Sequence, residues 1–241
     1  RNNDAHKDLS LIRSRSVLVE SRTRLINSVR GQIKATGHRL RSCGAATFHK
    51  NLDLLPESVV EELTPLMEVI KELTLKIKYY DKAIKTCGEE SYPETQRLRQ
   101  IEGIGPITAL AFVLILDDPT RAPTSRAAGA FVGLTSRKRQ SSSSDPNLGI
   151  SKTGDPYLRK LLVQAAHYVL GPFGAPSDIR DWGLQLAARI GKKKAVIAVA
   201  RKLAVVMHRL WTTGDDYLCF PKETEKQEDL QTTHEAEEMA A

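Results

Sequence analysis

Apolar side chains repeat every seven residues along two stretches of the chain, and this repeat constrains the fold more than any other feature. Between residues 60 and 84 the repeat forms two neighbouring rows. One row is Leu63, Ile70, Ile77 and Ile84, and the other is Val60, Met67 and Thr74. Steps of three and four residues place both rows on one face of an α-helix. The sequence therefore predicts a long helix, and Pro65 either kinks it or marks its true start after Thr64.

Residues 9–35 predict a second long helix, which Gly37 is expected to end. Its apolar rows are Leu11, Leu18 and Leu25 beside Ile12, Val19, Ile26 and Ile33. Two such helices fit an antiparallel hairpin, an intermolecular coiled coil, or ordinary core helices of one bundle. Two or three heptads do not choose among these arrangements.

From Arg97 onward the pattern changes to shorter helices. They are predicted at residues 106–116, 124–132, 155–170, 178–190 and 193–212, and no strand is predicted. The predicted fold class is all-α: a long helical hairpin or coiled-coil region, then a compact helical domain that contains a helix-hairpin-helix turn. The predicted divisions are residues 1–92, residues 93–220, and an acidic disordered tail at residues 221–241.

Basic side chains are in excess outside that tail. The chain has 36 Lys and Arg against 29 Asp and Glu, and removal of the tail leaves 34 basic and 22 acidic residues. This excess suits a polyanionic partner such as nucleic acid, and it also fits a merely soluble surface. Three scattered cysteines exclude a disulfide framework and fit a reducing cytosol. No apolar run reaches membrane-spanning length, and the opening Arg leads us to expect a fragment or a processed chain.

A Gly-Ile-Gly-Pro turn at residues 103–106 precedes an apolar helix. The turn lacks the third glycine and the preceding strand of a dinucleotide-binding fingerprint, which excludes that kind of site. Gly103 and Gly105 have no Cβ to hold a phosphate away from the backbone, and a helix starting at Pro106 offers free N–H groups. The pattern predicts a helix-hairpin-helix contact with a nucleic-acid backbone, and the alternative is a plain turn between helices.

A basic, serine-rich loop follows at residues 137–144. Arg137, Lys138 and Arg139 come directly before Gln140 and four serines. Three cations beside hydroxyl groups are able to hold a phosphodiester while a serine attacks the phosphorus and forms a phosphoserine intermediate. The alternative is a flexible surface loop, which is the commoner meaning of a serine run.

A second cluster of cations surrounds a predicted helix start. Asp155 is a natural N-cap with Pro156 at the first helical position. Lys152, Arg159 and Lys160 are close enough in sequence to form a phosphate clamp, and the alternative is a capped helix with solvated cations.

The remaining motifs predict structural or supporting roles. Lys192, Lys193 and Lys194 predict a basic turn that adds to the positive field rather than to the chemistry. Trp182 and Trp211 are predicted to anchor the core. No metal site is predicted, because no set of Cys, His, Asp and Glu has metal-site spacing.

Taken in order, these motifs resemble the transposases of bacterial insertion sequences that join a RuvC-like, DEDD-type nuclease domain to a C-terminal serine domain, the bridge-RNA-guided recombinases. The resemblance covers about residues 9–220 and is strongest over residues 103–159. It is carried by IEGIGPITA, by residues 127–135, by GISKTGDPYLRKLLVQAA and by KKKAVIAVARKLAVVMHRLW.

The resemblance implies specific roles. Counting from residues 133–135 and back from Lys152 places the family's nucleophile at Ser141, with Ser142 as the fallback. The family usually has glycine directly after the nucleophile and basic residues where Asp145 and Pro146 stand here. It also implies Mg²⁺ held by a RuvC-like domain, which we expect to be missing from this chain, and no cofactor in the chain itself. The implied partners are DNA, a guide RNA and further copies in a dimer or tetramer, in the bacterial cytoplasm at the nucleoid.

We therefore predict a DNA transposase that cleaves and rejoins strands through Ser141. The scissile phosphate is expected among Arg137, Lys138, Arg139 and Lys152, with the nucleic-acid backbone held at Gly103 and Gly105. One alternative is a non-catalytic helix-hairpin-helix remnant that binds DNA or RNA. The other is a structural coiled-coil protein, which leaves the basic loop without a purpose.

Overall fold

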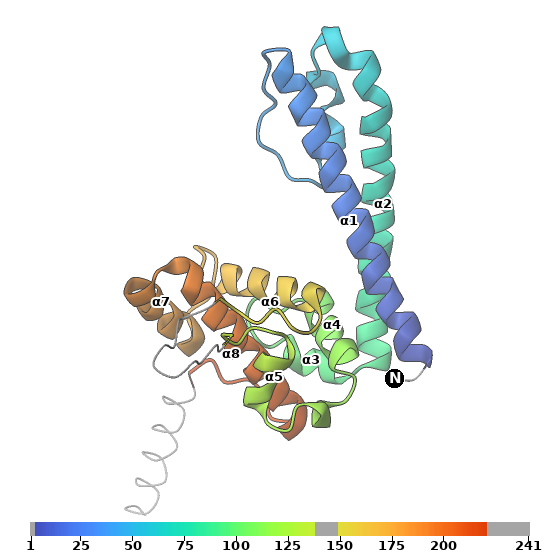
Figure 1. The fold of residues 1–241 in the computed structure, drawn as a ribbon. Coiled ribbons are helices and arrows are strands. Elements are labelled where there is room, and N and C mark those ends of the chain that lie inside the picture. The colour runs from blue at the N-terminus through green and yellow to red at the C-terminus, as the bar shows by residue number, and fades with distance from the viewer. Residues whose placement is uncertain (1–2, 138–148, 221–241) are drawn as a thin grey trace, which may run out of the picture. The chain divides into compact units, whose positions relative to one another are not determined.

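The computed structural model describes residues 3–137 and 149–220, and these residues form helices joined by turns and loops (Figure 1). Within these two ranges no strand forms, and Ser136 and Ile150 make an isolated antiparallel bridge. The prediction of an all-α fold is confirmed. The chain divides into two compact units, Arg1–Glu90 and Ser91–Ala241. The predicted acidic tail lies outside the described residues.

The first unit is built on two long helices, α1 (Asn3–Ala35) and α2 (Val60–Ser91). They are joined through the 3-10 helices η1 (Phe48–Leu54) and η2 (Glu57–Val59). Arg15 Nε lies 2.5 Å from Asp81 Oδ1, and Arg22 Nη1 donates to Thr74 Oγ1 at 3.3 Å. A step of seven residues forward along α1 is matched by seven back along α2, so the two helices run antiparallel within one chain.

Part of the predicted apolar rows lies in the core of this unit, and Leu11, Leu18, Val19, Leu25 and Val60 are only partly buried. In α2, the buried side chains are Leu63, Met67, Ile70, Thr74, Ile77 and Ile84. In α1, Ile12, Ile26 and Ile33 are buried as predicted. Pro65 lies inside α2, so the helix begins at Val60 and not after Thr64.

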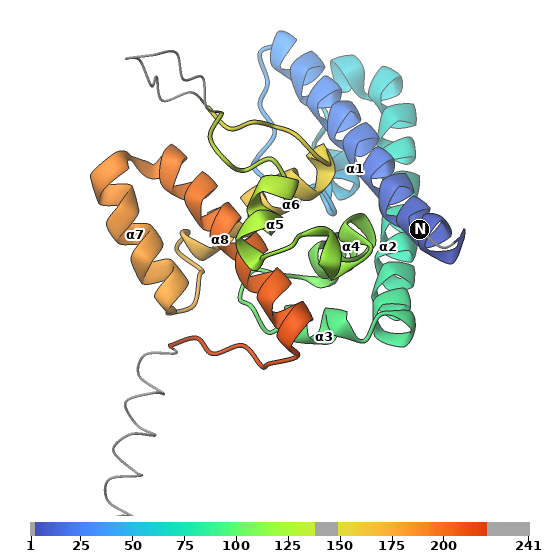
Figure 2. The ribbon, with the colours of Figure 1, turned by 60° about the horizontal axis from the view of Figure 1, so that its bottom comes forward.

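The second unit contains shorter helices packed around a central one. In chain order these are α3 (Glu94–Leu98), α4 (Pro106–Leu116), η3 (Pro119–Arg121), α5 (Ser125–Phe131), α6 (Pro156–Val169), α7 (Asp178–Ile190) and α8 (Lys192–Thr213). Helix α8 packs against α3, α5, α6 and α7. Figure 2 shows α8 passing between α7 and α5. Among the described residues, no helix is both long enough and apolar enough to cross a membrane.

The core of this unit is formed by α4 and by one face of α8. Every residue of α4 from Thr108 to Leu116 is buried, as expected for a helix that is apolar all round. His208 on α8 is 2% exposed, and both of its ring nitrogens have partners, Ser125 Oγ at 3.1 Å and the Pro119 carbonyl oxygen at 2.8 Å. The buried polar group is thereby satisfied.

The two tryptophans have different surroundings. Trp211 packs edge-on against Phe112, with the ring centroids 6.3 Å apart. Trp182 was predicted to anchor the core, and this prediction is wrong, because its side chain is 36% exposed. The cause is the neighbouring Gly183, where a Cβ would come within 2.7 Å of Leu170 and Val199 side-chain atoms. Helix α7 packs through this small residue, which turns the adjacent indole toward solvent.

Candidate nucleic-acid interface

A short antiparallel ladder holds together the two ends of the basic, serine-rich segment. The N–H of Arg137 donates to the Gly149 carbonyl oxygen at 3.0 Å, and the N–H of Ser151 donates to the Thr135 carbonyl oxygen at 2.8 Å. The N–H of Lys152 continues the ladder to the Gly133 carbonyl oxygen at 3.1 Å. These bonds hold residue 137 beside residue 149.

Two glycines allow the chain segments below this ladder to pack backbone against backbone. A Cβ on Gly133 would lie 2.0 Å from the Thr153 carbonyl oxygen, and a Cβ on Gly154 would lie 2.0 Å from that of Phe131. Both glycines also have a positive φ, +74° and +78°. No other residue fits either position without moving the backbone. The glycines of the GLT and TGD motifs are therefore explained by packing.

The start of α6 follows the prediction for a capped helix. One carboxylate oxygen of Asp155 accepts from the N–H of Tyr157 at 2.8 Å and from that of Leu158 at 3.0 Å. Pro156 occupies the first turn. These bonds satisfy backbone donors that have no partner within the helix. The predicted N-cap is confirmed.

The three cations around this cap have different environments. Arg159 Nη1 donates to the carbonyl oxygens of Val132 and Thr153, each at 2.9 Å, and so fastens together the two segments that the glycines bring into contact. Lys152 is exposed on the turn, with a φ of +58°. Lys160 is exposed on α6. The predicted clamp therefore contains one arginine with a structural contact and two lysines on the surface.

Helix α8 begins with three exposed lysines, Lys192, Lys193 and Lys194. Gly191 precedes them and supplies no side-chain cap, and the first turn contains no acidic residue. A helix N-terminus carries a partial positive charge, so cations in its first turn repel it. This arrangement is electrostatically unfavourable, and an anion bound nearby would offset the repulsion.

The start of α8 and the base of the serine-rich segment meet at one pocket. Lys193, Lys194, Ser136 and Gly149 all line it. Ser136 and Gly149 flank the segment of residues 138–148, which contains Ser141, Ser142, Lys138 and Arg139 and lies outside the described residues. The structure thus brings two of the three predicted lysines of α8, Lys193 and Lys194, to the same pocket as Ser136 and Gly149.

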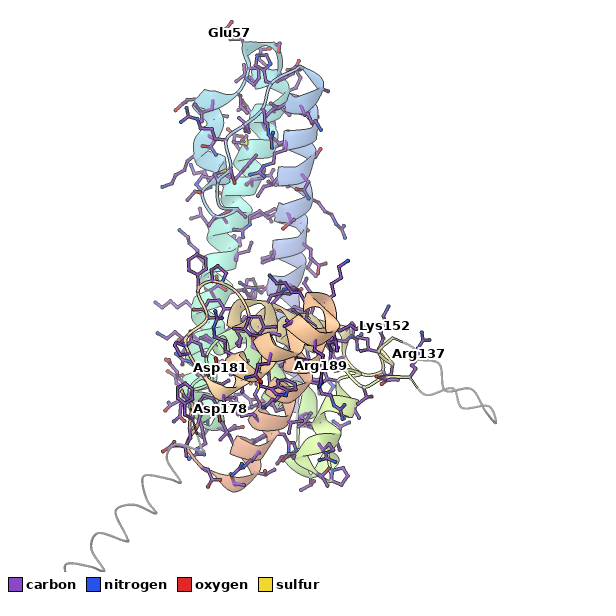
Figure 3. All side chains as sticks on the ribbon, turned by 90° about the vertical axis from the view of Figure 1, so that its left-hand side faces the viewer. Glu57, Arg137, Lys152, Asp178, Asp181 and Arg189 are labelled. Atoms are coloured by element: carbon purple, nitrogen blue, oxygen red, sulfur yellow. The ribbon has the colours of Figure 1, made fainter. Side chains whose placement is uncertain are left out.

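The acidic residues of α7 lie away from this region. Figure 3 shows Asp178 and Asp181 at one end of α7 and Arg189 at the other, on the side where Arg137 and Lys152 lie. This order suits the helix dipole, with acids in the first turn and a base in the last. It also keeps carboxylates apart from the basic residues that flank the serine-rich segment.

The turn at Gly103 and Gly105 lines a separate hollow of about 460 Å³. Gly103 has a φ of +84° and packs against α6, where a Cβ would lie 3.3 Å from the Ala165 carbonyl oxygen. A Cβ on Gly105 would meet no atom within 4 Å. Glu102 in the same turn accepts a hydrogen bond from the Tyr168 hydroxyl at 3.1 Å, and this carboxylate raises the pKa of Tyr168.

This geometry is compatible with both interpretations of the turn. Gly103 is required by packing, whereas Gly105 leaves the N-terminus of α4 open. The hollow beside the turn and the pocket beside the serine-rich segment share no lining residue. The helix-hairpin-helix contact with nucleic acid stays a prediction.

Among the described residues, no group of three or more His, Cys, Asp and Glu side chains is arranged to hold a metal ion. The family resemblance assigns Mg²⁺ to a RuvC-like domain rather than to these residues.

Sequence reasoning missed four residues that line the pocket: Arg126, Trp182, Arg201 and Lys202. A signal for two of them was present. Arg201 follows Lys193 by eight residues and Lys202 follows Lys194 by eight, a spacing that puts each pair on one side of a helix. Arg126 and Trp182 lie on α5 and α7, and only the packing of those helices against α8 brings them to the same place.

Comparison with known proteins relates the chain to one class of transposase. Residues 95–176 match the model of the Transposase IS116/IS110/IS902 family. These residues extend from α3 to the loop before α7, and so include the ladder, both close-packed glycines and the capped start of α6.

Similarity to individual proteins extends over most of the chain. It is 34% identical over 218 residues to the transposase for insertion sequence element IS1111A from Coxiella burnetii, which covers 87% of this chain and 60% of the relative. It is 31% identical to a probable family 20 transposase from Pseudomonas aeruginosa, over 88% of this chain and 64% of the relative. It is also 31% identical to the transposase for insertion sequence element IS1328 from Yersinia enterocolitica, over 89% of this chain and 65% of the relative.

The chain thus spans a little under two thirds of the length of these relatives. The family match falls on the helical unit that holds the candidate interface, and the wider similarity takes in the long helices as well. By sequence, the chain is related to the transposases of the IS116/IS110/IS902 family.

Proposed function

We propose that this chain is the nucleic-acid-binding and nucleophile-bearing part of an insertion-sequence transposase. The observation that carries the proposal is the ladder between residues 133–137 and 149–152, which presents both ends of the serine-rich segment beside the lysines of α8. The similarity to transposases supports DNA as the substrate. The net positive charge of the chain supports a phosphate-rich partner.

The proposed reaction is a transesterification at phosphorus. The hydroxyl oxygen of Ser141 loses its proton and attacks a scissile phosphodiester, a phosphoserine bond forms, and one strand end leaves as a free hydroxyl after taking up a proton. The reverse step uses a hydroxyl of a second strand to attack the phosphoserine and release Ser141. One phosphoester bond forms for each one that breaks, so rejoining needs no external energy source.

The cations have a defined role in this scheme. Arg137, Lys138, Arg139 and Lys152 would screen the charge of the phosphate from the incoming serine oxygen. Lys192, Lys193, Lys194 and Lys160 would bind flanking phosphates. Arg159 would act through its two backbone contacts, by keeping the turn that carries Lys152 against the end of α5.

The proposal includes partners beyond DNA. A guide RNA and assembly into a dimer or tetramer follow from the family resemblance, since exchange between two duplexes requires several nucleophiles. The region of the relatives that this chain does not cover would supply the RuvC-like domain and its Mg²⁺.

The decisive test is a search for a covalent protein–DNA adduct. Labelled DNA that spans the junction between an insertion-sequence end and its flank is incubated with the chain, guide RNA and a RuvC-like domain in trans. The products are resolved under denaturing conditions. We expect an adduct with the wild type and none with Ser141→Ala, with the modified peptide identified by mass spectrometry.

A matched control separates the nucleophile from its neighbours. Ser144→Ala changes the same loop by the same atom and is expected to keep the adduct. An adduct that survives Ser141→Ala but not Ser142→Ala moves the nucleophile by one residue. If a full-length relative reacts in the same assay and this chain binds DNA without an adduct, the non-catalytic alternative is correct.

A further inference from the structure

The pocket between α5, α7 and α8 has features that phosphate binding alone does not explain. Its volume is about 1000 Å³, at the upper end of the range of about 300–1,000 Å³ for sites that hold small organic ligands. Five cations line it, and none of the described residues that line it is acidic. The five are Arg126, Lys193, Lys194, Arg201 and Lys202.

The cations on α8 share one side of the helix because of their spacing. Lys193 and Arg201 are eight residues apart, and Lys194 and Lys202 are likewise eight apart, with Ile197 and Ala198 between them. Residues four and eight apart lie along the same face. Along the α8 face that lines the pocket, the apolar side chains of Ile197 and Ala198 therefore lie between two pairs of cations.

The floor of the pocket is apolar. Leu134 is buried and Ile150 is partly buried, and they enter from the segments that form the ladder. Ile197 on α8 is also partly buried. A site built only for a phosphate needs donors and no apolar floor, whereas a flat ring with a charged substituent needs both.

Trp182 adds an aromatic surface to this pocket. Its side chain is 36% exposed, and Lys202 Nζ lies 4.6 Å from the ring centroid. A cation over one face of an indole is attracted by the ring quadrupole and fixes the ring in place. An indole held in a basic pocket is the arrangement on which nucleobases stack in grooves for single-stranded nucleic acid.

We propose that this pocket holds one unpaired nucleotide of a bound nucleic acid, with its base stacked on Trp182 and its phosphates on the surrounding cations. The nucleotide must be unpaired, because the faces of a base inside a duplex are covered by its neighbours. The inference rests on the proposed function only in taking nucleic acid as the partner. It assigns to Trp182 a binding role that needs no strand cleavage.

Tryptophan fluorescence tests the proposal directly, since the chain has only Trp182 and Trp211. In the full chain with Trp211→Phe, all indole emission comes from Trp182. The probe is single-stranded oligothymidylate of about 12 nucleotides, within the site sizes that such grooves cover. The matched probe is an abasic strand of the same length and charge. We expect the oligothymidylate to quench the emission and the abasic strand to bind without quenching.

Two further comparisons complete the assay. Oligouridylate of the same length distinguishes RNA from DNA as the source of the nucleotide. In Trp182→Phe, neither oligonucleotide should quench the remaining emission, which comes from Trp211. Trp182→Ala should weaken binding of oligothymidylate by about fivefold or more, the lower end of the loss per stacked base, and leave abasic binding unchanged. This second variant keeps the test valid if Trp211→Phe does not fold.

The outcomes separate this inference from the proposed reaction. Binding of both strands without quenching of Trp182, or equal quenching by both, overturns the pocket assignment and leaves the serine chemistry standing. Selective quenching supports the assignment even where no covalent adduct forms. Failure to bind any strand overturns the pocket assignment and the nucleic-acid partner together.

Discussion

Gly133 and Thr153 lie in backbone contact, so close that a Cβ on Gly133 would stand 2.0 Å from the Thr153 carbonyl oxygen. The contact joins the end of α5 to the turn before α6, which are the two segments that frame residues 138–148. The close approach of these two segments therefore depends on a residue that carries no side chain.

Gly133→Ala should destabilise the protein by about 3 kcal/mol or more, because it combines a steric clash with a positive φ of an L-residue. Urea unfolding followed by circular dichroism measures the change. Gly149→Ala is the matched control, since a Cβ there meets nothing within 4 Å, and it should change stability by less than about 0.5 kcal/mol. Equal effects of the two substitutions would contradict the contact.

Arg159→Ala should lower the free energy of unfolding by about 2 kcal/mol, because two backbone carbonyl oxygens lose a charged donor. Arg159→Lys should restore little of this, since the Nζ of a lysine is one bond closer to the backbone than the Nη1 that donates to both acceptors. Denaturant unfolding of the two variants is the measurement. Unchanged stability with loss of nucleic-acid binding would instead place Arg159 in the predicted phosphate clamp.

Lys193→Gln and Lys194→Gln should each weaken binding to nucleic acid and reduce the slope of log K against log salt by up to about 0.9, the value for one phosphate contact on duplex DNA. Each should also raise stability by a few tenths to about 1 kcal/mol, because a cation leaves the positive end of α8. Filter binding across a salt series and thermal unfolding report the two effects.

Arg209→Gln is the control for these lysines. Arg209 is an exposed cation on the same helix and does not line the pocket. Its substitution should leave the salt slope near the wild-type value. A slope reduced equally by all three variants would mean that the protein binds through its overall charge rather than through the start of α8.

The free energy of unfolding should decrease at high pH because of the ionisation of Tyr217. Burial, with the nearby Cys219, Asp178 and Glu102, raises the pKa of Tyr217 from its ordinary value near 10 to about 12. Between these two values the folded state keeps a proton that the unfolded state has lost, so the free energy of unfolding decreases as pH rises. Unfolding curves from pH 9 to pH 12 should show a steeper loss for the wild type than for Tyr217→Phe. Parallel curves would contradict the shift.

Local signals in the sequence predicted most of the helices. The predicted helices at residues 106–116 and 178–190 coincide with α4 and α7, and α8 extends one residue beyond the prediction at each end. These helices have strong end signals, such as Pro106 after Gly105 and the cap at Ser177, whose side chain accepts from the N–H of Arg180. Helix α3 was missed, because its five residues are too few to show a period.

Local signals in the sequence predicted only part of the candidate site. The cap at Asp155 is a local interaction between neighbours in sequence, and it was found. The pocket joins α5, α7 and α8, and the sequence contains no local signal for their approach. Trp182 was assigned to the core because large aromatic residues usually bury their area, whereas the small Gly183 beside it sets how closely α7 packs on α8.

The hydrogen bonds of the ladder join residues 133–137 directly to residues 149–152. Arg137 N and the Gly149 carbonyl oxygen are 3.0 Å apart, which is the separation that a two-residue hairpin turn such as Asn-Gly closes. A variant in which Asn-Gly replaces residues 138–148 is therefore expected to keep the fold of the helical unit.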